Sequence, residues 1–334
     1  MKKTLVALAA VAVTTGAMAE ATLTGSVQVG SNQLSTTTSG SSAVNTLTFE
    51  DSNGNTVFNI GDTEDLGGGL MFKGNIAVET GLFSNALAQA NGVNETYGSL
   101  TGGFGGIKVG ALQTPQFLAI AAGDASGLLI SNTVYTNNTH QGGTTGANVL
   151  LQTKSIQYTT PTLVDGLSLK YQLGAGGNAG NVSDANHFAG DYKTGAFAAG
   201  IAYSTYKFAA STTDKATTYY ANYDLGAVKL LALWGKAETS GSSDVNSTSI
   251  GFTVPMGAAT FMYNHSSSDG RVTVRSVSTV DQAGDFVGVS YALSKRTTAY
   301  AAFYKETGND AQAATSVASG STWNTTRFIL IHSF

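Results

Sequence analysis

The chain has no cysteine and few charged residues, and both absences limit what it can be. Without cysteine it forms no disulfide and offers no thiolate as a nucleophile or metal ligand. Charged residues make up 11% of the chain, against roughly 25% in soluble globular domains. The mean hydropathy is nevertheless near zero, and beyond residue 19 no apolar run approaches the ~20 residues of a transmembrane helix. The composition therefore fits neither a charge-covered soluble protein nor a helical membrane protein.

The first 19 residues have the pattern of a secretory signal peptide. Lys2 and Lys3 precede an apolar run at residues 5–13, and AMA at residues 17–19 is a small-residue cleavage signal. The alternative, an amphipathic first helix, is disfavoured because the apolar run has no polar face. Removing two lysines from the 17 basic residues leaves 15 against 21 acidic residues, a formal net charge of −6. This mild acidic balance argues against nucleic acid as a partner.

Apolar and polar residues alternate along many short segments. In residues 70–82, LMFKGNIAVETGL, the even positions are mostly apolar and the odd positions carry Lys73, Asn75 and Glu79. Residues 106–112 and 167–173 repeat the pattern. A period of two is typical of a strand with one apolar and one polar face. In an exported chain without a membrane helix, such strands predict a closed β-barrel whose outward face meets lipid and whose inward face meets water.

Short and long connections alternate between these segments. The short ones are residues 63–69, 102–106, 161–166, 193–196, 224–227, 255–258 and 294–297. The long ones, rich in Ser, Thr, Asn and Gly, lie near residues 31–46, 84–94, 114–152, 174–187, 207–216, 238–247, 266–283 and 307–321. The predicted fold class is therefore all-β: a sixteen-stranded antiparallel transmembrane β-barrel with short periplasmic turns and long extracellular loops. It forms one domain over residues 20–334.

The last eight residues, RFILIHSF, alternate up to the C-terminus. Phe328, Leu330, His332 and Phe334 share one face, and Arg327 lies on the other. We expect this strand to pair with residues 21–30, so that the barrel closes without an exposed edge. Its aromatic face should then point to lipid near the periplasmic interface, where aromatic residues are enriched.

Five segments are distinctive: GDTEDLGGGL at 61–70, SLTGGFGGIKVG at 99–110, IQYTTP at 156–161, LSKRT at 293–297 and the ending IHSF. Together they resemble segments of the Gram-negative general-diffusion porins, most closely the betaproteobacterial porins. The resemblance implies a barrel in the cell outer membrane, surrounded by lipid and lipopolysaccharide and usually a homotrimer. It implies that the third loop, residues 114–152 here, folds inward to narrow the channel. It also implies that the terminal strand is an assembly signal for the barrel-assembly machinery, read from Phe328, Leu330, His332 and Phe334.

Seven charged residues are candidates for lining or constricting the pore. Strand parity and loop position select Lys73, Glu79, Glu95, Lys108, Asp124, Lys170 and Arg327. We expect the wall residues Lys73, Glu79 and Glu95 to face Asp124 of the third loop; the alternative for each is a solvated wall position away from the narrowest point. Relatives commonly carry arginines on the second and fourth strands, but VFNIG at 57–61 and NE at 94–95 contain none. This mixture of signs predicts weak selectivity, near neutral or mildly favouring cations.

No other group of residues carries recognisable chemistry. The four histidines, His140, His187, His265 and His332, lack metal-ligand spacing, and GGFGGIK at 102–108 lacks the spacing of a phosphate-binding loop. DSNGN at 51–55 begins like a calcium loop, but its glycine comes fourth and no glutamate closes it. A hairpin turn explains these residues better, with a weak calcium contact as the alternative. We therefore expect no metal, no cofactor and no enzymatic activity.

The sequence favours a passive, water-filled channel for small hydrophilic solutes and ions. Two alternatives remain open. One is a substrate-specific outer-membrane channel that uses the apolar third loop as a binding surface, which saturable block by a sugar or peptide would favour. The other is a surface adhesin or structural barrel with an occluded lumen, which absence of conductance in a planar bilayer would favour.

Overall fold

The computed structural model describes most of the chain after the expected signal peptide. The described residues are 21–37, 42–50, 56–81, 86–88, 94–127, 150–175, 182–208, 213–241, 243–273, 276–278, 281–308 and 321–334. The predicted signal peptide at residues 1–19, the possible calcium loop at 51–55, His140 and the third loop from 128 to 149 lie outside them.

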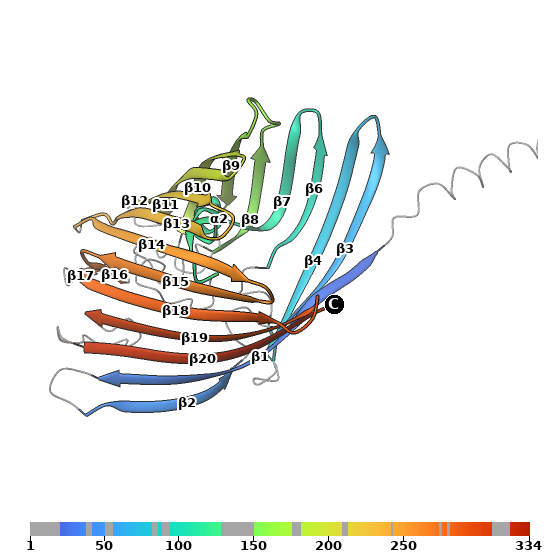
Figure 1. Ribbon diagram of the computed structural model, residues 1–334. Helices are drawn as coiled ribbons and strands as arrows, with labels where there is room; N and C mark the ends of the chain where they lie inside the picture. The colour runs from blue at the N-terminus through green and yellow to red at the C-terminus, as the bar shows by residue number, and fades with distance from the viewer. Residues whose placement is uncertain are drawn as a thin grey trace, which may run out of the picture.

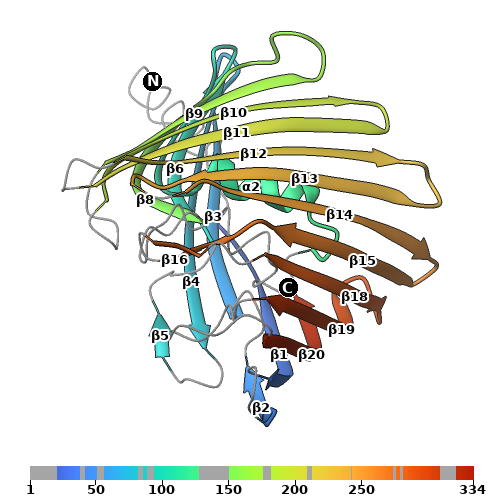
Figure 2. The same ribbon diagram turned by 90° about the vertical axis from the view of Figure 1, so that its left-hand side faces the viewer.

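Sixteen antiparallel strands form a closed barrel, as the sequence predicts (Figures 1 and 2). The closing pair consists of β1 (Thr22–Thr37) and β20 (Ser321–Ser333), with a register that runs from Ser26 opposite Ser333 to Thr37 opposite Thr322. Beyond it, the backbones of Gly25 and Phe334 exchange two hydrogen bonds of 3.1 Å each. Because the last strand pairs with the first, the barrel has no open edge at this position.

The other barrel strands follow one another around the wall in chain order. They are β3 (Thr56–Gly67), β4 (Leu70–Gly81), β6 (Thr96–Gly102), β7 (Gly105–Gln113), β8 (Leu151–Thr159), β9 (Leu167–Ala175), β10 (Val182–Thr194), β11 (Phe197–Phe208), β12 (Thr213–Asp224), β13 (Lys229–Glu238), β14 (Val245–Met256), β15 (Ala259–Ser268), β18 (Gln282–Ala292) and β19 (Thr297–Gly308). Four further strands lie in the long connections: β2 (Val44–Glu50), β5 (Ala86–Ala88), β16 (Arg271–Thr273) and β17 (Ser276–Ser278).

Exposure alternates along the strands and identifies the two faces of the wall. On β12, Thr218 and Tyr220 are buried, whereas Tyr219 between them is 45% exposed. The alternate positions whose side chains point out of the barrel, called the outward parity, carry large apolar side chains on many strands, for example Ile76 on β4 and Ile250 on β14. The positions between them, whose side chains point into the barrel, are called the inward parity. An apolar outward face of this kind is what hydrocarbon requires of a transmembrane strand.

Parts of the predicted loops are strands, which corrects their boundaries. Strand β1 continues to Thr37 and β2 begins at Val44, both within the predicted loop at 31–46. Strand β15 likewise continues to Ser268, within the predicted loop at 266–283. The loop end of β15 is polar on both faces: the hydroxyl of Ser247 donates to that of Ser268 at 3.0 Å, and Thr248 and Ser267, one pair further from the loop, are joined by a hydroxyl hydrogen bond of 2.8 Å. A criterion of apolar–polar alternation therefore misses this end of the strand.

The predicted third loop begins with a helix, which is a second correction. Helix α2 (Pro115–Gly123) follows directly after β7 and lies inside the barrel, where the strands surround it (Figure 2). The inward course of this segment agrees with the prediction, but its helical conformation was not foreseen. Among the described residues, no helix is long and apolar enough to cross a membrane.

Closure has a simple experimental signature. We expect the purified protein to give a β-sheet circular dichroism spectrum and to migrate faster in a detergent gel before boiling than after it. The reason is that each barrel strand is hydrogen-bonded to a neighbour on both sides, so detergent finds no edge at which to start unfolding the wall. A mainly helical spectrum, or equal mobility with and without boiling, would contradict the closed barrel.

Candidate functional site

The residues at the start of helix α2 are typical of a helix N-terminus. Thr114 is the N-cap: its backbone is extended, and its hydroxyl accepts a hydrogen bond of 3.1 Å from the backbone N–H of Phe117. Pro115 occupies the first helical position, where its fixed φ suits the helix and its missing N–H leaves no bond unmade. The capped turn therefore directs the chain into the barrel as soon as β7 ends.

The helix rests on a part of the wall that is built for close approach. Ala119 and Ile120 pack against Ala189, Ala202 and Leu233, together with Tyr220, in one buried cluster. The small side chains on β10 and β11 allow the helix to lie near the strand backbones. We call this wall region the α2 seat and define it by Ala189, Ala202, Tyr220 and Leu233.

Glycine and hydrogen bonds hold the end of α2 against the seat. A Cβ atom at Gly123 would lie 2.4 Å from Leu233 Cδ2, so only glycine permits this contact without a shift. The amide of Gln116 donates to the hydroxyl of Thr218. The amide of Asn222 donates to the carbonyl oxygen of Ala122 at 3.2 Å. The helix is thus held by packing along its length and by a polar contact near each end.

Glu95 and Lys108 form an ion pair at the root of the inward segment. The other oxygen of the Glu95 carboxylate accepts a 2.9 Å hydrogen bond from the backbone N–H of Gln113, the last residue of β7. The Lys108 ammonium also lies 3.8 Å from the centroid of the Tyr97 ring, within cation–π range. Glu95 therefore contacts both Lys108 and the last residue of β7, at the point where the chain turns inward. Its negative charge is balanced by the Lys108 ammonium.

Two more of the predicted wall residues lie on the inward parity of β4. Glu79 is fully buried, and one of its carboxylate oxygens accepts a 2.5 Å hydrogen bond from the Asn94 amide. Lys73, six residues towards the periplasmic turn, is exposed. On this strand the cation faces water and the carboxylate does not.

Lys170 belongs to a hydrogen-bonded group that spans four strands of the inward wall, from β9 to β12. Its ammonium lies 2.8 Å from Asp191 on β10, and the Tyr220 hydroxyl donates to the other oxygen of Asp191 at 2.9 Å. Gly200 lies between them: a Cβ there would approach Tyr220 Cε1 to 2.4 Å and Asp191 Oδ1 to 2.8 Å. The missing side chain leaves room for Tyr220, which therefore links this group to the α2 seat.

Asp124 and Arg327 are both buried in the structure. Asp124 is only 6% exposed and caps the end of α2, where its oxygens accept from the backbone N–H and the hydroxyl of Ser126 at 2.9 and 2.6 Å. The helix it ends packs on β10 to β13 and not on β4. Arg327, also 6% exposed, lies on the inward parity of β20. The structure thus joins Glu95 with Lys108 and Lys170 with Asp191, and it places Asp124 at the end of a helix that packs on β10 to β13.

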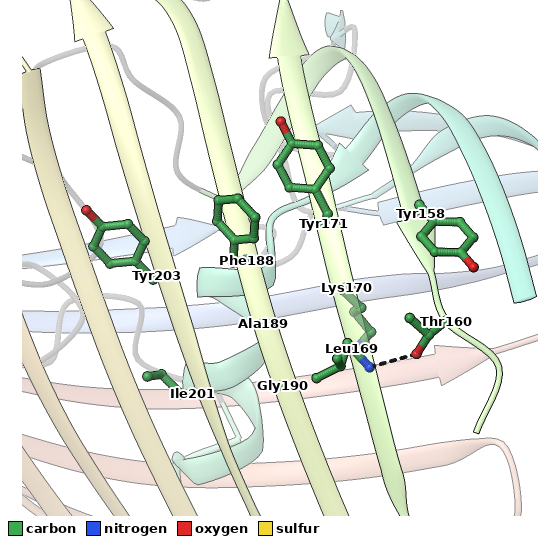
Figure 3. Close-up of a pocket in the computed structure, with 10 residues that line it drawn as sticks. All are labelled: Tyr158, Thr160, Leu169, Lys170, Tyr171, Phe188, Ala189, Gly190, Ile201 and Tyr203. Atoms are coloured by element: carbon green, nitrogen blue, oxygen red, sulfur yellow. Dashed lines mark hydrogen bonds between the residues drawn. The ribbon is translucent and has the colours of Figure 1, made fainter. Parts of the chain in front are cut away.

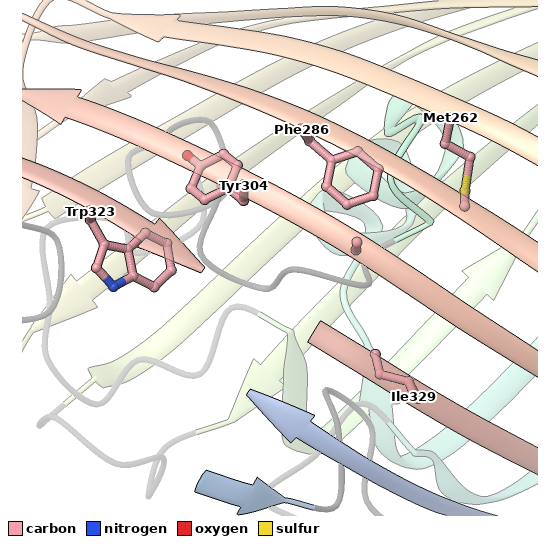
Figure 4. Close-up of a cluster of buried hydrophobic side chains, with 6 residues drawn as sticks. Met262, Phe286, Tyr304, Trp323 and Ile329 are labelled. Atoms are coloured by element: carbon pink, nitrogen blue, oxygen red, sulfur yellow. The ribbon is translucent and has the colours of Figure 1, made fainter. Parts of the chain in front are cut away.

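The inward face of the last strands carries an apolar cluster that sequence reasoning missed. Phe286, Tyr304 and Trp323 are buried side by side with Met262, Ala302 and Ile329 (Figure 4). Tyr304 and Trp323 meet edge to face with ring centroids 5.4 Å apart. The alternation along β20 could have indicated the face of two members, because Trp323 and Ile329 share the face of Arg327. The lumen is therefore not lined by polar residues alone.

An apolar hollow on β8 to β11 lies on the other side of the wall. Its lining includes Tyr171, Phe188, Ile201 and Tyr203, which project from the outward parity around Gly190 (Figure 3). Tyr171 and Phe188 pack with ring centroids 4.7 Å apart. This hollow faces lipid and is separate from the channel. Within the described residues, no three potential ligands from His, Cys, Asp and Glu gather as a metal site.

A closed transmembrane barrel with a helix folded against its inner wall defines the class of channel-forming outer-membrane barrels. The Gram-negative porin family matches residues 5–312, and the chain belongs to this family. It is an outer-membrane porin, a channel for passive diffusion. Among curated protein sequences, none matches.

Solved porin structures share the fold at low sequence identity. An anion-selective porin from Comamonas acidovorans is 20% identical, with a TM-score of 0.79 over 95% of this chain and 100% of that one. OmpT of Vibrio cholerae is 11% identical, with a TM-score of 0.68 over 94% and 97%. OmpF of Salmonella typhi, in complex with daunomycin, is 13% identical, with a TM-score of 0.68 over 95% and 98%.

Proposed function

We propose that this porin passes small hydrophilic solutes and ions with weak charge selectivity that leans towards anions. The observation that carries the proposal is the pairing of Glu95 with Lys108, because it balances a carboxylate that would otherwise favour cations. Asp124 is buried and hydrogen-bonded to Ser126, which weakens its effect on a permeating ion. Lys73 remains exposed on the inward parity. Exposed charges near the path act on permeating ions more than paired or buried ones do.

The proposal includes partners but no catalysis. We propose a homotrimer in outer-membrane lipid and lipopolysaccharide, inserted by the barrel-assembly machinery. One solved OmpT structure from Vibrio cholerae is described as a trimer form, which supports this assembly by analogy. We propose no enzymatic activity and no cofactor, in line with a family and a fold known as channels.

Neutralising either partner of the Glu95–Lys108 pair should shift the reversal potential in opposite directions. Glu95→Gln keeps an oxygen that can accept from Gln113 but leaves the Lys108 charge unbalanced, so we expect a shift towards anions. Lys108→Met leaves Glu95 unbalanced, so we expect a shift towards cations. Both shifts should be larger at 0.1 M than at 1 M salt, because the screening length falls from about 10 Å to about 3 Å.

The measurement is the reversal potential of purified channels in a planar bilayer under a salt gradient. The double variant, Glu95→Gln with Lys108→Met, is the control, since it removes the pair and restores a neutral site. It should lie close to wild type. Shifts of the same sign in both single variants would show that this pair does not face the ion path. Wild-type protein that inserts without conducting would favour an occluded barrel over a channel.

A further inference from the structure

A small polar pocket lies at the periplasmic end of β10 to β13. It is lined by Lys193, Gly195, Ala196, Phe197, Ala198, Asn222, Asp224, Gly226 and Lys229, and its volume is about 380 Å³. Two short turns form its floor: one joins β10 to β11, and the other joins β12 to β13. Lys193 shares the inward parity of Asp191, and Lys229 shares that of Leu231 and Leu233. The pocket therefore opens towards the periplasmic mouth of the channel.

The two lysines of this pocket are available for a ligand. Neither ammonium group forms an ion pair with any residue in the described part of the chain. Asp224 is the one carboxylate of the lining, and its Oδ1 is occupied by a 2.8 Å hydrogen bond from the backbone N–H of Gly226. Asp224 also lies opposite Lys229 in the register of β12 and β13. The pocket thus presents two ammonium groups against a single carboxylate, a formal excess of one positive charge.

The pocket lies next to helix α2, on its periplasmic side. Asn222, at its upper rim, donates to the carbonyl oxygen of Ala122 in the last turn of α2. Tyr220, two residues further up β12, belongs to the α2 seat. The neighbouring charges on this wall, Lys170 and Asp191, neutralise each other. A solute that has passed α2 therefore meets the two unpaired ammonium groups next, at the exit to the periplasm.

We propose that this pocket is a subsite for compact oxyanions, with phosphate and carboxylate groups as its ligands. The inference rests on the proposed function and extends it by naming the place where an anion binds transiently. Lysine ammonium groups suit this role because each is a compact charge with three donors on a flexible stem. Hydrogen bonds between charged donors and oxyanions are stronger than neutral ones. A wall of low dielectric also raises the local concentration of the attracted ion.

The test uses inorganic tripolyphosphate as a blocker of single channels in potassium chloride. Added from the periplasmic side, it should reduce the current of the wild-type channel in a concentration-dependent manner. In the double variant Lys193→Ala/Lys229→Ala, the half-blocking concentration should rise roughly tenfold, as the loss of two close charge contacts implies. The matched control is Lys295→Ala/Arg296→Ala, which removes two positive charges from the exposed turn between β18 and β19. It should leave the half-blocking concentration close to wild type.

Three results would contradict the subsite. The first is a wild-type channel that conducts potassium chloride but is not blocked by tripolyphosphate. The others are equal weakening of the block in both double variants, and block only when tripolyphosphate is added from the extracellular side. Line broadening of the phosphorus resonance of phosphate, measured with the folded protein in detergent, gives a readout that does not depend on conduction. Broadening that Lys193→Ala/Lys229→Ala abolishes would support the subsite even if the channel proved closed. In that case the proposed function would fail and the subsite would stand.

Discussion

Replacing Ala202 with leucine is expected to lower the single-channel conductance by roughly half, because pore width controls conduction at the constriction. Ala202 is fully buried in the α2 seat, against Ala119 and Ile120 of the helix. Three extra carbon atoms there have no space, and overpacking of this kind costs about 1–3 kcal/mol if the contact is kept. The strand is fixed by backbone hydrogen bonds on both sides, whereas α2 is held against the wall by side-chain packing and side-chain hydrogen bonds. The helix should therefore move away from the wall and into the channel.

The control for this prediction is an identical substitution on the other face of the same strand. Ala199 lies on the outward parity of β11, so Ala199→Leu adds the same atoms to the lipid-facing surface. It should leave the conductance unchanged. A second variant, Thr218→Val, removes the hydroxyl that accepts from Gln116 and adds no bulk to the helix contact. If Ala202→Leu conducts like wild type while remaining folded, the α2 seat does not determine the width of the channel.

The barrel itself could be predicted from the sequence because its signals are local. Apolar–polar alternation marks each membrane-spanning strand, and short turns separate strands that pair with their neighbours in the chain. Residues 327–334 carry the same alternation to the end, which was sufficient to predict their pairing with β1. Hydrocarbon favours this pattern, because a lipid-facing surface is predominantly apolar. Where the alternation stops, as at the serine-rich end of β15, the sequence no longer predicts the strand.

The arrangement of charges could be predicted only in part. Strand alternation gives the face of Lys108 and of Lys170, but it cannot indicate which charges meet. The Glu95–Lys108 pair depends on the register of β6 and β7, in which Ser99 lies opposite Lys108. Asp124 was selected for its charge alone, and its burial follows from the turn that it forms with Ser126. A charge count along a loop therefore overestimates the field in the pore.

Helix α2 and the apolar lumen cluster were missed for different reasons. The helix had a local signal, since a Thr-Pro pair at the end of a strand is a capped helix start. It was overlooked because a long connection in a barrel was interpreted as a loop. The cluster has no local signal. Tyr304 and Trp323 meet only because β19 and β20 place Glu306 opposite Trp323 across a long connection. Parity gives the face of each residue, and the register decides its neighbours.

Deleting Phe334 is expected to cut the amount of barrel assembled in the outer membrane several-fold while weakening the folded barrel only slightly. Its ring lies 5.6 Å from that of Phe58 on β3, and its backbone pairs with Gly25. Only glycine fits at position 25, because a Cβ there would lie 2.8 Å from Phe334 Cζ and 2.2 Å from the carbonyl oxygen of Val57. The terminal residue therefore packs across the closing seam, where β20, β1 and β3 meet. Losing this contact should cost the folded state at most about 3 kcal/mol, the value of one buried phenylalanine.

We expect the larger effect on assembly because Phe334 acts before the barrel has closed. Before closure, β20 and β1 are both open edges, and an aromatic end exposed on the outward face is available to the assembly machinery that we propose reads it. Phe334→Tyr keeps the ring and should assemble at nearly the wild-type level. Phe303→Ala removes an outward aromatic from the neighbouring strand β19 and is the matched control. Outer-membrane levels measured by heat-dependent gel mobility, together with the thermal stability of refolded protein, separate the two effects. If the truncated chain assembles as well as Phe303→Ala, or if its refolded barrel is as deficient as its assembly, the terminal residue acts only as packing.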